Sequence, residues 1–334
     1  MVCKVSINGF GRIGRLILRA IFESRRSDIE VIAINDLGSI AESAHLFKYD
    51  SVHGPFPGTV EIQDEGLKIN NHFIKVFSIP NPMVLPWKEL DVDVAMECSG
   101  RFTKREDAAA HLSAGAKKVL ISAPAEGADL TVVWGVNHNE LKPNHKVVSN
   151  ASCTTNCLAP VAYILHKAIG IEHGFMTTIH SYTGDQRLVD TLHKDLRRAR
   201  AAALSLIPAS TGAAKAVGLV LPELAGKLDG TAVRVPTPNV SLIDFKFVSK
   251  RPTSKDEINK EIAQAAEGEL RGILTINDAP LVSIDFNHDS ASSIFDLKET
   301  HVIEGKFCRV LSWYDNEWGF SNRMADTAVA MEKV

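Results

Sequence analysis

The sequence predicts an α/β protein in which a doubly wound parallel sheet is followed by an α+β domain with a mixed or antiparallel sheet. Three observations support this fold class. A glycine-rich turn joins the first strand-like run to the first helical run, strands and helices then alternate through the first half, and strand patterns dominate the last third. A length of 334 residues suggests two domains, which we place at residues 1–150 and 151–316.

Composition argues against several classes of partner. A formal net charge of -3 gives no reason to expect nucleic acid or a membrane. Five cysteines without disulfide spacing indicate free thiols in a reducing compartment. No second Cys or His pair accompanies Cys153 and Cys157 at zinc spacing, so we expect no metal site. The N-terminus runs directly into a strand pattern and no apolar run has membrane length, so we expect a cytoplasmic protein without a signal peptide.

The first strand and helix enclose a dinucleotide fingerprint. Residues 2–7 have a strand pattern and residues 16–23 a helical one, and Gly9, Gly11 and Gly14 stand between them as G-x-G-x-x-G. The first glycine of this fingerprint permits a tight turn, the second lets a pyrophosphate approach the backbone, and the third lets helix and strand pack closely. The pattern predicts a Rossmann-type domain. The alternative is a glycine-rich turn in another strand–helix–strand unit.

The second strand, residues 30–34, is followed by Asp36, about 20 residues beyond the last glycine as the fingerprint requires. A carboxylate there accepts hydrogen bonds from ribose hydroxyls and repels a 2′-phosphate. No arginine stands in residues 37–39 to bind that phosphate. This favours NAD over NADP and leaves dual use open.

The rest of the first half continues the alternation. Residues 61–76 predict a small antiparallel excursion, and residues 103–113 a helix with a Thr103/Glu106 capping box. Ser99 and Ser122 end buried strands, where a doubly wound sheet binds its ligand, so we expect them to contact the cofactor. The other strands are expected at 92–98, 119–124 and 130–136.

Cys153 lies at the start of a helical pattern in the middle of the chain. Asn150 or Ser152 is a suitable N-cap, which places the thiol in the first turn. The positive end of the helix dipole should lower the pKa of this thiol and make it a nucleophile. A buried structural thiol is the alternative, and this stretch alone does not decide between the two.

The second half adds groups that suit such a nucleophile. A strand at residues 174–179 ends at His180, whose imidazole could deprotonate or pair with the thiol, although a surface histidine is the alternative. The charged run at 193–200 and the helix start at 210–215 suit an anion. Arg234 stands in a strand pattern where an unpartnered charge would be costly. Together these features indicate an anionic, most simply phosphorylated, substrate.

The last third predicts more strands and a final helix. Residues 240–248 form a long apolar strand pattern, and Ser254 with Glu257 caps a helix. An amphipathic helix is expected over residues 321–331. Strands are expected at 281–286, 292–296 and 306–314.

Taken together, these motifs resemble those of phosphorylating glyceraldehyde-3-phosphate dehydrogenases over essentially the whole chain, and in detail those of the bacterial and chloroplast branch. The matching segments are residues 7–15, 149–160, 180–187, 195–202, 210–217, 234–240 and 313–319.

The resemblance implies a reaction in which Cys153 attacks the aldehyde of glyceraldehyde 3-phosphate and His180 activates the thiol and takes the hydroxyl proton. Hydride transfer to NAD leaves a thioester, from which inorganic phosphate releases 1,3-bisphosphoglycerate. The implied substrate-phosphate site is Thr183 and Arg234. The implied attacking-phosphate site is Ser152, Thr154, Arg198, Thr211 and Gly212. The implied NAD contacts include Arg12, Ile13, Asp36, Ser122 and Asn316, with Asn316 holding the carboxamide.

The resemblance also implies a homotetramer in which the loop at about 181–207 packs near a neighbour's cofactor. It implies that the C-terminal helix, residues 317–334, returns to the NAD-binding domain. Two positions depart from the pattern, because Pro80 stands where many relatives carry arginine or lysine, and Arg101 where an apolar residue is more usual. Rival functions are erythrose-4-phosphate dehydrogenase, a cysteine hydrolase that makes no use of the fingerprint, and a nucleotide-binding scaffold without turnover.

Overall fold

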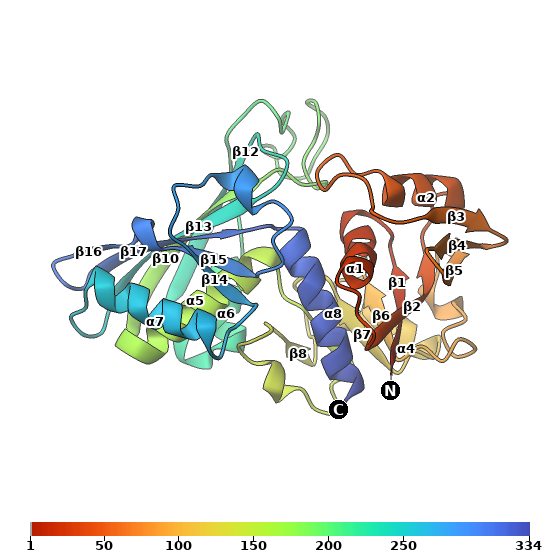
Figure 1. The fold of residues 1–334 in the computed structure, drawn as a ribbon, viewed down its shortest axis with the longest axis horizontal. Helices are drawn as coiled ribbons and strands as arrows, with labels where there is room; N and C mark the ends of the chain where they lie inside the picture. The colour runs from red at the N-terminus through yellow and green to blue at the C-terminus, as the bar shows by residue number, and fades with distance from the viewer. Residues whose placement is uncertain (1) are drawn as a thin grey trace. The chain divides into compact units, whose positions relative to one another are not determined.

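A computed structural model describes residues 2–334 and divides into two compact units, each built on its own sheet (Figure 1). The first unit comprises the chain up to Trp134 together with His138–Ala151 and Ser321–Val334. The second comprises Gly135–Asn137 and Ser152–Phe320. Within the described range, no helix is both long enough and apolar enough to cross a membrane.

The sheet of the first unit is mostly parallel. Its order is β3-β4-β5-β2-β1-β6-β7-β9-β8, and only the β3-β4-β5 excursion is antiparallel. Because β1 pairs with β2 on one side and with β6 on the other, the carboxyl ends of β1 and β6 form the topological switch point. The strands are β1 (Cys3–Asn8), β2 (Ile29–Asn35), β3 (Val60–Gln63), β4 (Gly66–Ile69), β5 (His72–Phe77), β6 (Val94–Glu97), β7 (Lys118–Ile121), β8 (Leu130–Thr131) and β9 (Val147–Ser149).

The helices of the first unit differ in how their N-termini are capped. The helix α2 (Ile40–Lys48) has a capping box between Ser39 and Glu42. The predicted helix at 103–113 is two short ones. The Thr103/Glu106 box is wrong, because the N-cap of α3 is Lys104 and no side chain caps this helix. The remaining elements are α1 (Arg12–Glu23), η1 (Pro82–Val84), α3 (Arg105–Ala108), α4 (Ala110–Ser113), η2 (His138–Glu140) and most of α8 (Trp318–Glu332).

The C-terminal helix α8 is bound into the first unit through its polar groups. Asp326 forms an ion pair with Arg26, and the Thr327 hydroxyl donates to Asn150 Oδ1 at 2.9 Å. The Lys118 ammonium donates to the carbonyl of Met331. Most of the last helix of the chain therefore belongs to the first unit.

The sheet of the second unit is mixed, as predicted. Its order is β11-β12-β10-β13-β17-β15-β14, with β16 paired to β17. The β10–β12 and β14–β15 pairs are parallel and the others antiparallel. The strands are β10 (Ile171–Ser181), β11 (Ile207–Ser210), β12 (Leu228–Val235), β13 (Ser241–Ser249), β14 (Leu274–Asn277), β15 (Ser293–Asp296), β16 (His301–Ile303) and β17 (Phe307–Tyr314).

The helices of the second unit pack on its sheet (Figure 1). They are α5 (Cys153–Ile169), α6 (Ala213–Val220) and α7 (Lys255–Glu267), with the short turns η3 (Pro222–Leu224), η4 (Ser283–Phe286) and η5 (Leu297–Glu299). The predicted strand at 281–286 is wrong, because Ser283–Phe286 forms a 3₁₀ turn. Its apolar side chains do not form a buried face, since Val282 and Ile284 are exposed, and the Asp285 carboxylate caps the turn.

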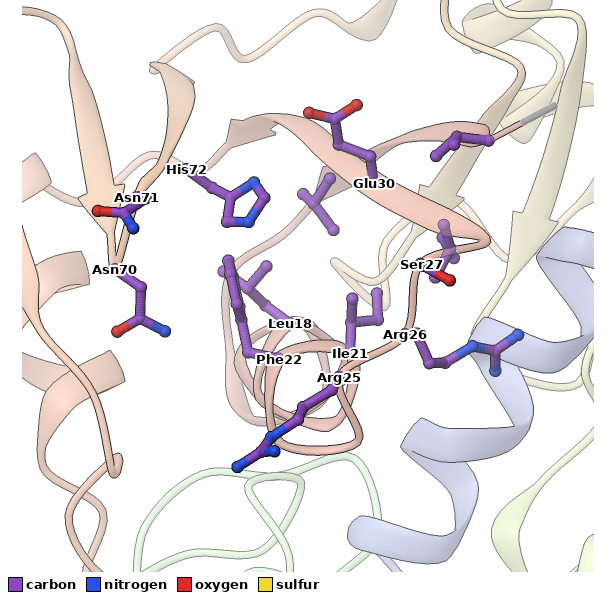
Figure 2. Close-up of a pocket in the computed structure, with 13 residues that line it drawn as sticks. Leu18, Ile21, Phe22, Arg25, Arg26, Ser27, Glu30, Asn70, Asn71 and His72 are labelled. Atoms are coloured by element: carbon purple, nitrogen blue, oxygen red, sulfur yellow. The ribbon is translucent and has the colours of Figure 1, made fainter.

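A cavity of about 500 Å³ lies at the amino ends of the strands in the first unit (Figure 2). Leu18, Ile21 and Phe22 of α1 form one wall, and His72 with its neighbours at the β4–β5 turn forms another. Doubly wound sheets bind their dinucleotide at the opposite, carboxyl edge. The cofactor site is therefore to be sought elsewhere in this unit.

Candidate active site

The glycine-rich turn lies at the switch point of the first sheet. Gly9 has φ +92°, and a Cβ there would lie 2.5 Å from the Ser99 Cα. A Cβ on Gly14 would lie 2.2 Å from the Gly9 carbonyl oxygen, whereas no heavy atom of the described chain comes within 4 Å of the corresponding point on Gly11. The turn is thus closed by its outer glycines and open at the middle one, which suits a pyrophosphate at the start of α1. Arg12 and Ile13 form the first turn of this helix.

The Asp36 carboxylate lies beside a cavity of about 250 Å³ at the carboxyl ends of the strands. It accepts from the backbone N–H groups of Phe10 at 2.6 Å and Gly38 at 2.9 Å, so its orientation is set before a ligand arrives. A fixed carboxylate beside an open glycine turn fits the ribose and pyrophosphate of a dinucleotide. The cavity is also lined by Asn8, Gly9, Gly11, Asn35, Ile79, Pro80, Ser99 and Arg101.

Five of the predicted cofactor contacts lie outside that lining set, namely Arg12, Ile13, Gly14, Ser122 and Asn316. Arg12 forms an ion pair with Asp50 at 2.5 Å, which holds its side chain to the segment after α2. Ser122 follows β7, and its N–H donates to the Glu97 carbonyl at 3.0 Å. Their contact with NAD stays a prediction.

Cys153 is the first residue of α5. The Ser152 hydroxyl caps the helix by accepting from the Thr155 N–H at 3.1 Å, so Ser152 rather than Asn150 is the N-cap. Ala151 has φ +56°, an unfavourable value for a residue with a side chain. The chain therefore makes a strained turn immediately before the thiol.

The Cys153 sulfur lies 3.5 Å from His180 Nε2. Burial raises the pKa of this thiol above its usual range, and the Arg234 charge and hydrogen bonds from Thr154 offset that rise only in part. The backbone N–H groups of Cys153 and Thr154 at the helix start do lower the pKa, as predicted, but burial outweighs them and the net shift is upward. Cys157, one turn further along, is fully buried, and burial raises the pKa of its thiol to about 12.

The ring of His180 stays neutral at ordinary pH. Burial, together with the charges of Arg234 and Arg198, lowers the pKa of His180 from 6.5 to about 3. Arg234 is its register partner on the parallel strand β12, which explains how a charged residue of a strand reaches the imidazole.

His180 Nδ1 has two possible hydrogen-bond partners, the Arg234 guanidinium and the Ser181 carbonyl oxygen. Nδ1 lies 2.8 Å from the Arg234 Nη1 and 2.8 Å from the Ser181 carbonyl oxygen, and that Nη1 lies 2.9 Å from the same oxygen. Arginine only donates, so a bond from Arg234 to Nδ1 places the ring proton on Nε2, facing the sulfur. A bond from Nδ1 to the Ser181 carbonyl leaves the Nε2 lone pair facing the sulfur instead. The proton position on this ring therefore decides whether it can act as a base.

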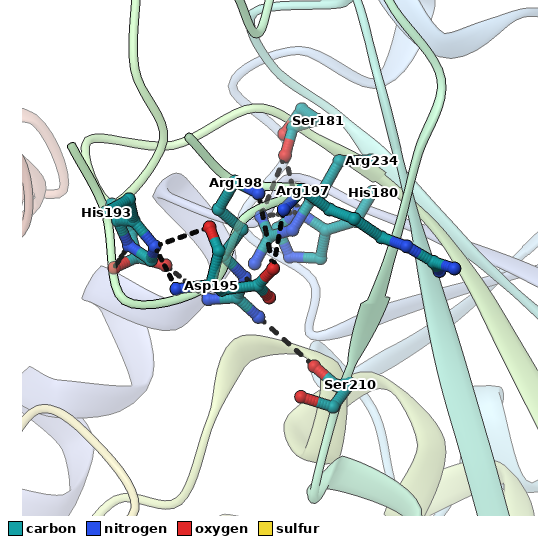
Figure 3. Close-up of polar contacts among 9 residues, drawn as sticks. His180, Ser181, His193, Asp195, Arg197, Arg198, Ser210 and Arg234 are labelled. Carbon is teal, nitrogen blue, oxygen red and sulfur yellow. Dashed lines mark hydrogen bonds and ion pairs between the residues drawn. The ribbon is translucent and has the colours of Figure 1, made fainter. Parts of the chain in front are cut away.

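Arg198 is the loop arginine that faces the site (Figure 3). It forms an ion pair with Asp185 and donates to the Ser210 carbonyl at 3.2 Å, which joins the long loop to the end of β11. Arg197 is exposed, and its side chain extends away from the contacts drawn in Figure 3. Arg200 pairs with Asp190 at 2.6 Å. Of the three arginines that the sequence left undistinguished, Arg198 is thus the one near His180.

The other predicted anion-binding residues occupy helix starts and loops. Gly212 is the N-cap of α6, and the Thr211 hydroxyl accepts from the Ala213 N–H at 3.2 Å. The buried Thr154 hydroxyl hydrogen-bonds the Tyr314 hydroxyl at 2.8 Å. Thr183 lies in the loop that follows β10. The Ser210 carbonyl holds Arg198 near the segment that leads into α6. The guanidinium of Arg198 and the positive N-terminal end of α6 therefore lie close together.

Asn316 follows β17 in the second unit. Its Oδ1 accepts from the Ser181 hydroxyl at 2.7 Å and from the Ser241 hydroxyl at 2.8 Å, which fixes the side-chain carboxamide. Sequence reasoning missed both serines, as well as Tyr314, which links Thr154 to Thr178. Small polar residues inside strands carry no signal that pairs them across a sheet.

This set of groups can support nucleophilic chemistry on an anionic substrate. A thiol faces a neutral imidazole, Arg234 borders both, and Arg198 with the start of α6 offers a second anion-binding position. Among residues 2–334, no group of three or more His, Cys, Asp or Glu side chains is placed to hold a metal ion.

Comparison with known proteins agrees with both units. Residues 3–105 match the family described as "Glyceraldehyde 3-phosphate dehydrogenase, NAD binding domain", and residues 152–316 match its "C-terminal domain". The chain is 68% identical to the glyceraldehyde-3-phosphate dehydrogenase of Xanthobacter flavus and 63% identical to that of Cereibacter sphaeroides, in both cases over all of each chain. It is 56% identical to that of Geobacillus stearothermophilus over 98% of each chain. The chain belongs to the glyceraldehyde-3-phosphate dehydrogenase family and has the NAD-binding domain of that family.

Proposed function

We propose that this protein oxidises and phosphorylates glyceraldehyde 3-phosphate, with inorganic phosphate and NAD as co-substrates, to give 1,3-bisphosphoglycerate and NADH in glycolysis or gluconeogenesis. The observation that carries the proposal is the 3.5 Å approach of the Cys153 sulfur to His180 Nε2, with Arg234 in register beside the imidazole. Neither a cysteine hydrolase nor a scaffold accounts for the dinucleotide turn and this site together.

Cys153 acts as the nucleophile. Its sulfur forms a bond to the aldehyde carbon, and the thiol proton passes to the former carbonyl oxygen, which gives a hemithioacetal. His180 then takes the hydroxyl proton at Nε2 as the hydride leaves that carbon, and a thioester remains on Cys153. This step requires the tautomer in which Nδ1 donates to the Ser181 carbonyl. NAD supplies the hydride acceptor.

Two anion pockets divide the phosphate chemistry. Arg234 and Thr183 bind the phosphate of the aldehyde. Arg198, Ser152, Thr154, Thr211 and Gly212 bind inorganic phosphate, whose oxygen attacks the thioester carbon as the carbon–sulfur bond breaks. The proposal draws support from the two arginines, which approach His180 from different elements, Arg234 from β12 and Arg198 from the loop after β10. Bidentate guanidinium groups suit phosphate oxygens.

NAD binds with its pyrophosphate at Gly9, Gly11 and Gly14 and its adenosine ribose on Asp36. Arg12, Ile13, Ser99 and Ser122 are further contacts of the first unit, and Asn316 of the second holds the nicotinamide carboxamide. The NAD-binding domain in this proposal comprises residues 1–150 and 317–334. The catalytic domain, which binds the substrate, comprises residues 151–316.

The assembly is a homotetramer in the cytoplasm. Support comes from the loop at 181–207 with its flank, where six aliphatic side chains are between 68% and 91% exposed. So many exposed apolar side chains in one loop are costly in water unless a partner covers them, and a second copy of the chain is the simplest partner. The six side chains are Leu188, Val189, Leu192, Leu196, Leu204 and Leu206.

A cofactor-reduction assay tests the proposal. The purified chain is given glyceraldehyde 3-phosphate or erythrose 4-phosphate, with NAD or NADP, at several concentrations of inorganic phosphate. We expect kcat/KM to be highest for glyceraldehyde 3-phosphate with NAD, and turnover to depend strictly on phosphate. A higher kcat/KM for erythrose 4-phosphate, with turnover that needs no phosphate, would reassign the chain to the rival dehydrogenase.

A further inference from the structure

A buried carboxylate lies behind the dinucleotide cavity of the first unit. Glu97 is the last residue of β6 and is 1% exposed. One of its oxygens accepts from Asn8 Nδ2 at 2.6 Å and from His111 Nε2 at 3.0 Å. The other accepts from the Ser99 N–H at 2.8 Å and from the Ser99 hydroxyl. Four donors therefore converge on one side chain that the proposed chemistry does not use.

The tautomer of His111 is set by Trp87. The indole Nε1 lies 3.0 Å from His111 Nδ1, and an indole N–H can only donate. Nδ1 is therefore the acceptor, and the single proton of a neutral imidazole sits on Nε2, where it is donated to Glu97. Trp87 and His111 are both fully buried. The carboxylate is thus held by hydrogen bonds from neutral groups.

One branch of this network reaches the first wall of the cavity. The Ser99 hydroxyl, which donates to Glu97, accepts from the Arg101 N–H at 3.2 Å. Ser99 and Arg101 line the cavity together with Cys98 and Phe102. Ser99 also lies against Gly9, where the backbones leave no room for a side chain. Glu97 therefore fixes this wall relative to the glycine turn.

A second branch reaches the opposite wall. Asn8 Oδ1 accepts from Asn35 Nδ2 at 2.7 Å. Asn35 in turn bonds both backbone groups of Ile79, with its Nδ2 donating to the carbonyl at 3.0 Å and its Oδ1 accepting from the N–H at 2.9 Å. Ile79 and Pro80, which follow β5, also line the cavity, and in the sheet order β5-β2-β1-β6 they lie on the other side of β1 from Ser99, which follows β6. Asn35, the residue before Asp36, is therefore linked to the Glu97 carboxylate through Asn8.

We propose that Glu97 is a positioning residue for NAD, which sets the spacing of the two cavity walls through Ser99 on one side and Asn8 with Asn35 on the other. A buried polar network is stable only when every member is paired, and a complete one holds its members in a single arrangement. The network joins the last residues of β2, β1 and β6, so it fixes the adenosine side of the cavity before NAD binds. It makes no contact with Cys153 or His180 among the bonds described.

Glu97→Gln tests the proposal. The amide presents N–H donors to one of the two donor pairs, so either Ser99 or Asn8 with His111 loses its acceptor. We expect the Kd for NAD and for ADP-ribose, measured by calorimetry without aldehyde, to rise at least about tenfold. The KM for NAD should rise with it, while kcat at saturating NAD stays within about twofold of wild type. Glu106→Gln, which makes the same charge change at an exposed position of α3, is the matched control.

Trp87→Phe provides a second, milder variant. It removes only the N–H that sets the His111 tautomer, so the ring proton is no longer confined to Nε2. We expect the Kd for NAD to rise about threefold, and the downfield proton resonance of the His111 Nε2–H to shift or broaden. This readout also serves if Glu97→Gln fails to fold.

The outcome that overturns the proposal is an unchanged Kd for NAD and ADP-ribose in Glu97→Gln or Trp87→Phe, even with a lower melting temperature, since the network would then be structural only. Binding is measured without turnover. A chain that binds NAD but fails to oxidise glyceraldehyde 3-phosphate would therefore refute the proposed function and leave this inference standing.

Discussion

The cofactor cavity of the first unit and the anion-binding end of the second hold their polar groups in opposite ways. In the cavity, Asn8, Asn35 and Glu97 are at most 4% exposed and are joined by hydrogen bonds. At the anion-binding end, the loop arginine near His180 is held by an ion pair with a loop carboxylate that is exposed, that of Asp185 with Arg198. Buried networks are rigid, whereas exposed ion pairs contribute little and exchange readily. We therefore expect the first region to bind a ligand as it stands and the second to rearrange around one.

Cys153→Ser should produce the largest separation between the two regions. Oxidation of glyceraldehyde 3-phosphate should fall by more than about 1,000-fold, because a serine hydroxyl is a far weaker nucleophile than a thiol at neutral pH. The Kd for NAD should stay within about twofold of wild type. Rates come from cofactor reduction and the Kd from calorimetry. Retained activity would remove the sulfur from the mechanism.

Arg234→Ala should affect the second region through substrate charge. A charge-assisted hydrogen bond contributes about 1.5–3 kcal/mol, so kcat/KM for glyceraldehyde 3-phosphate should fall about 10- to 100-fold. The loss should be much smaller for unphosphorylated glyceraldehyde, because that aldehyde offers no phosphate to bind. Arg197→Ala, which removes an exposed arginine of the loop, is the control. Equal losses on both aldehydes would contradict the phosphate assignment.

Asp36→Asn should act on the first region only. Loss of the negative charge weakens the hydrogen bonds to the ribose hydroxyls and removes the repulsion of a 2′-phosphate, so the ratio of kcat/KM for NADP to that for NAD should rise about tenfold. The KM for glyceraldehyde 3-phosphate at saturating cofactor should not change. Asp107→Asn, at an exposed position of α3, is a suitable comparison. An unchanged cofactor ratio would remove Asp36 from the ribose site.

The smallest expected effect is the contribution of His180 to the pH dependence of the unfolding free energy. The pKa of His180 falls from 6.5 to about 3 in the folded chain, so below pH 6.5 the unfolded state binds a proton that the folded state does not. The stability associated with the neutral ring is complete above pH 6.5 and declines as the pH falls toward 3. Between pH 7 and 5.5 this group should cost about 1 kcal/mol of unfolding free energy.

His180→Asn and His180→Gln should both lack this contribution. Denaturant unfolding at the two pH values measures it as the difference between wild type and variant. An identical pH dependence in all three proteins would mean that the folded imidazole titrates normally. The predicted neutral base would then have no support.

The local features of both sites follow from the sequence because they depend on near neighbours. The turn at Gly9–Gly14, the Ser152 cap before Cys153 and the strand end at Asp36 each occupy a few consecutive residues, where backbone sterics and hydrogen bonding decide the geometry. Sequence periodicity failed at 281–286, where apolar spacing suited a strand but the side chains remain exposed around a 3₁₀ turn.

Sequence alone determined the fold class, the family and the identity of the thiol, the imidazole and the glycine turn. Only the tertiary structure decided that burial outweighs the helix N-terminus and raises the pKa of Cys153. It alone decided that Arg198 rather than Arg197 faces His180, and that Glu97 is bonded toward both walls of the cofactor cavity. Motifs report what a residue can do beside its neighbours in the chain. Desolvation and hydrogen-bond partners come from residues that meet only when strands pair, such as Asn8 and Glu97, 89 positions apart.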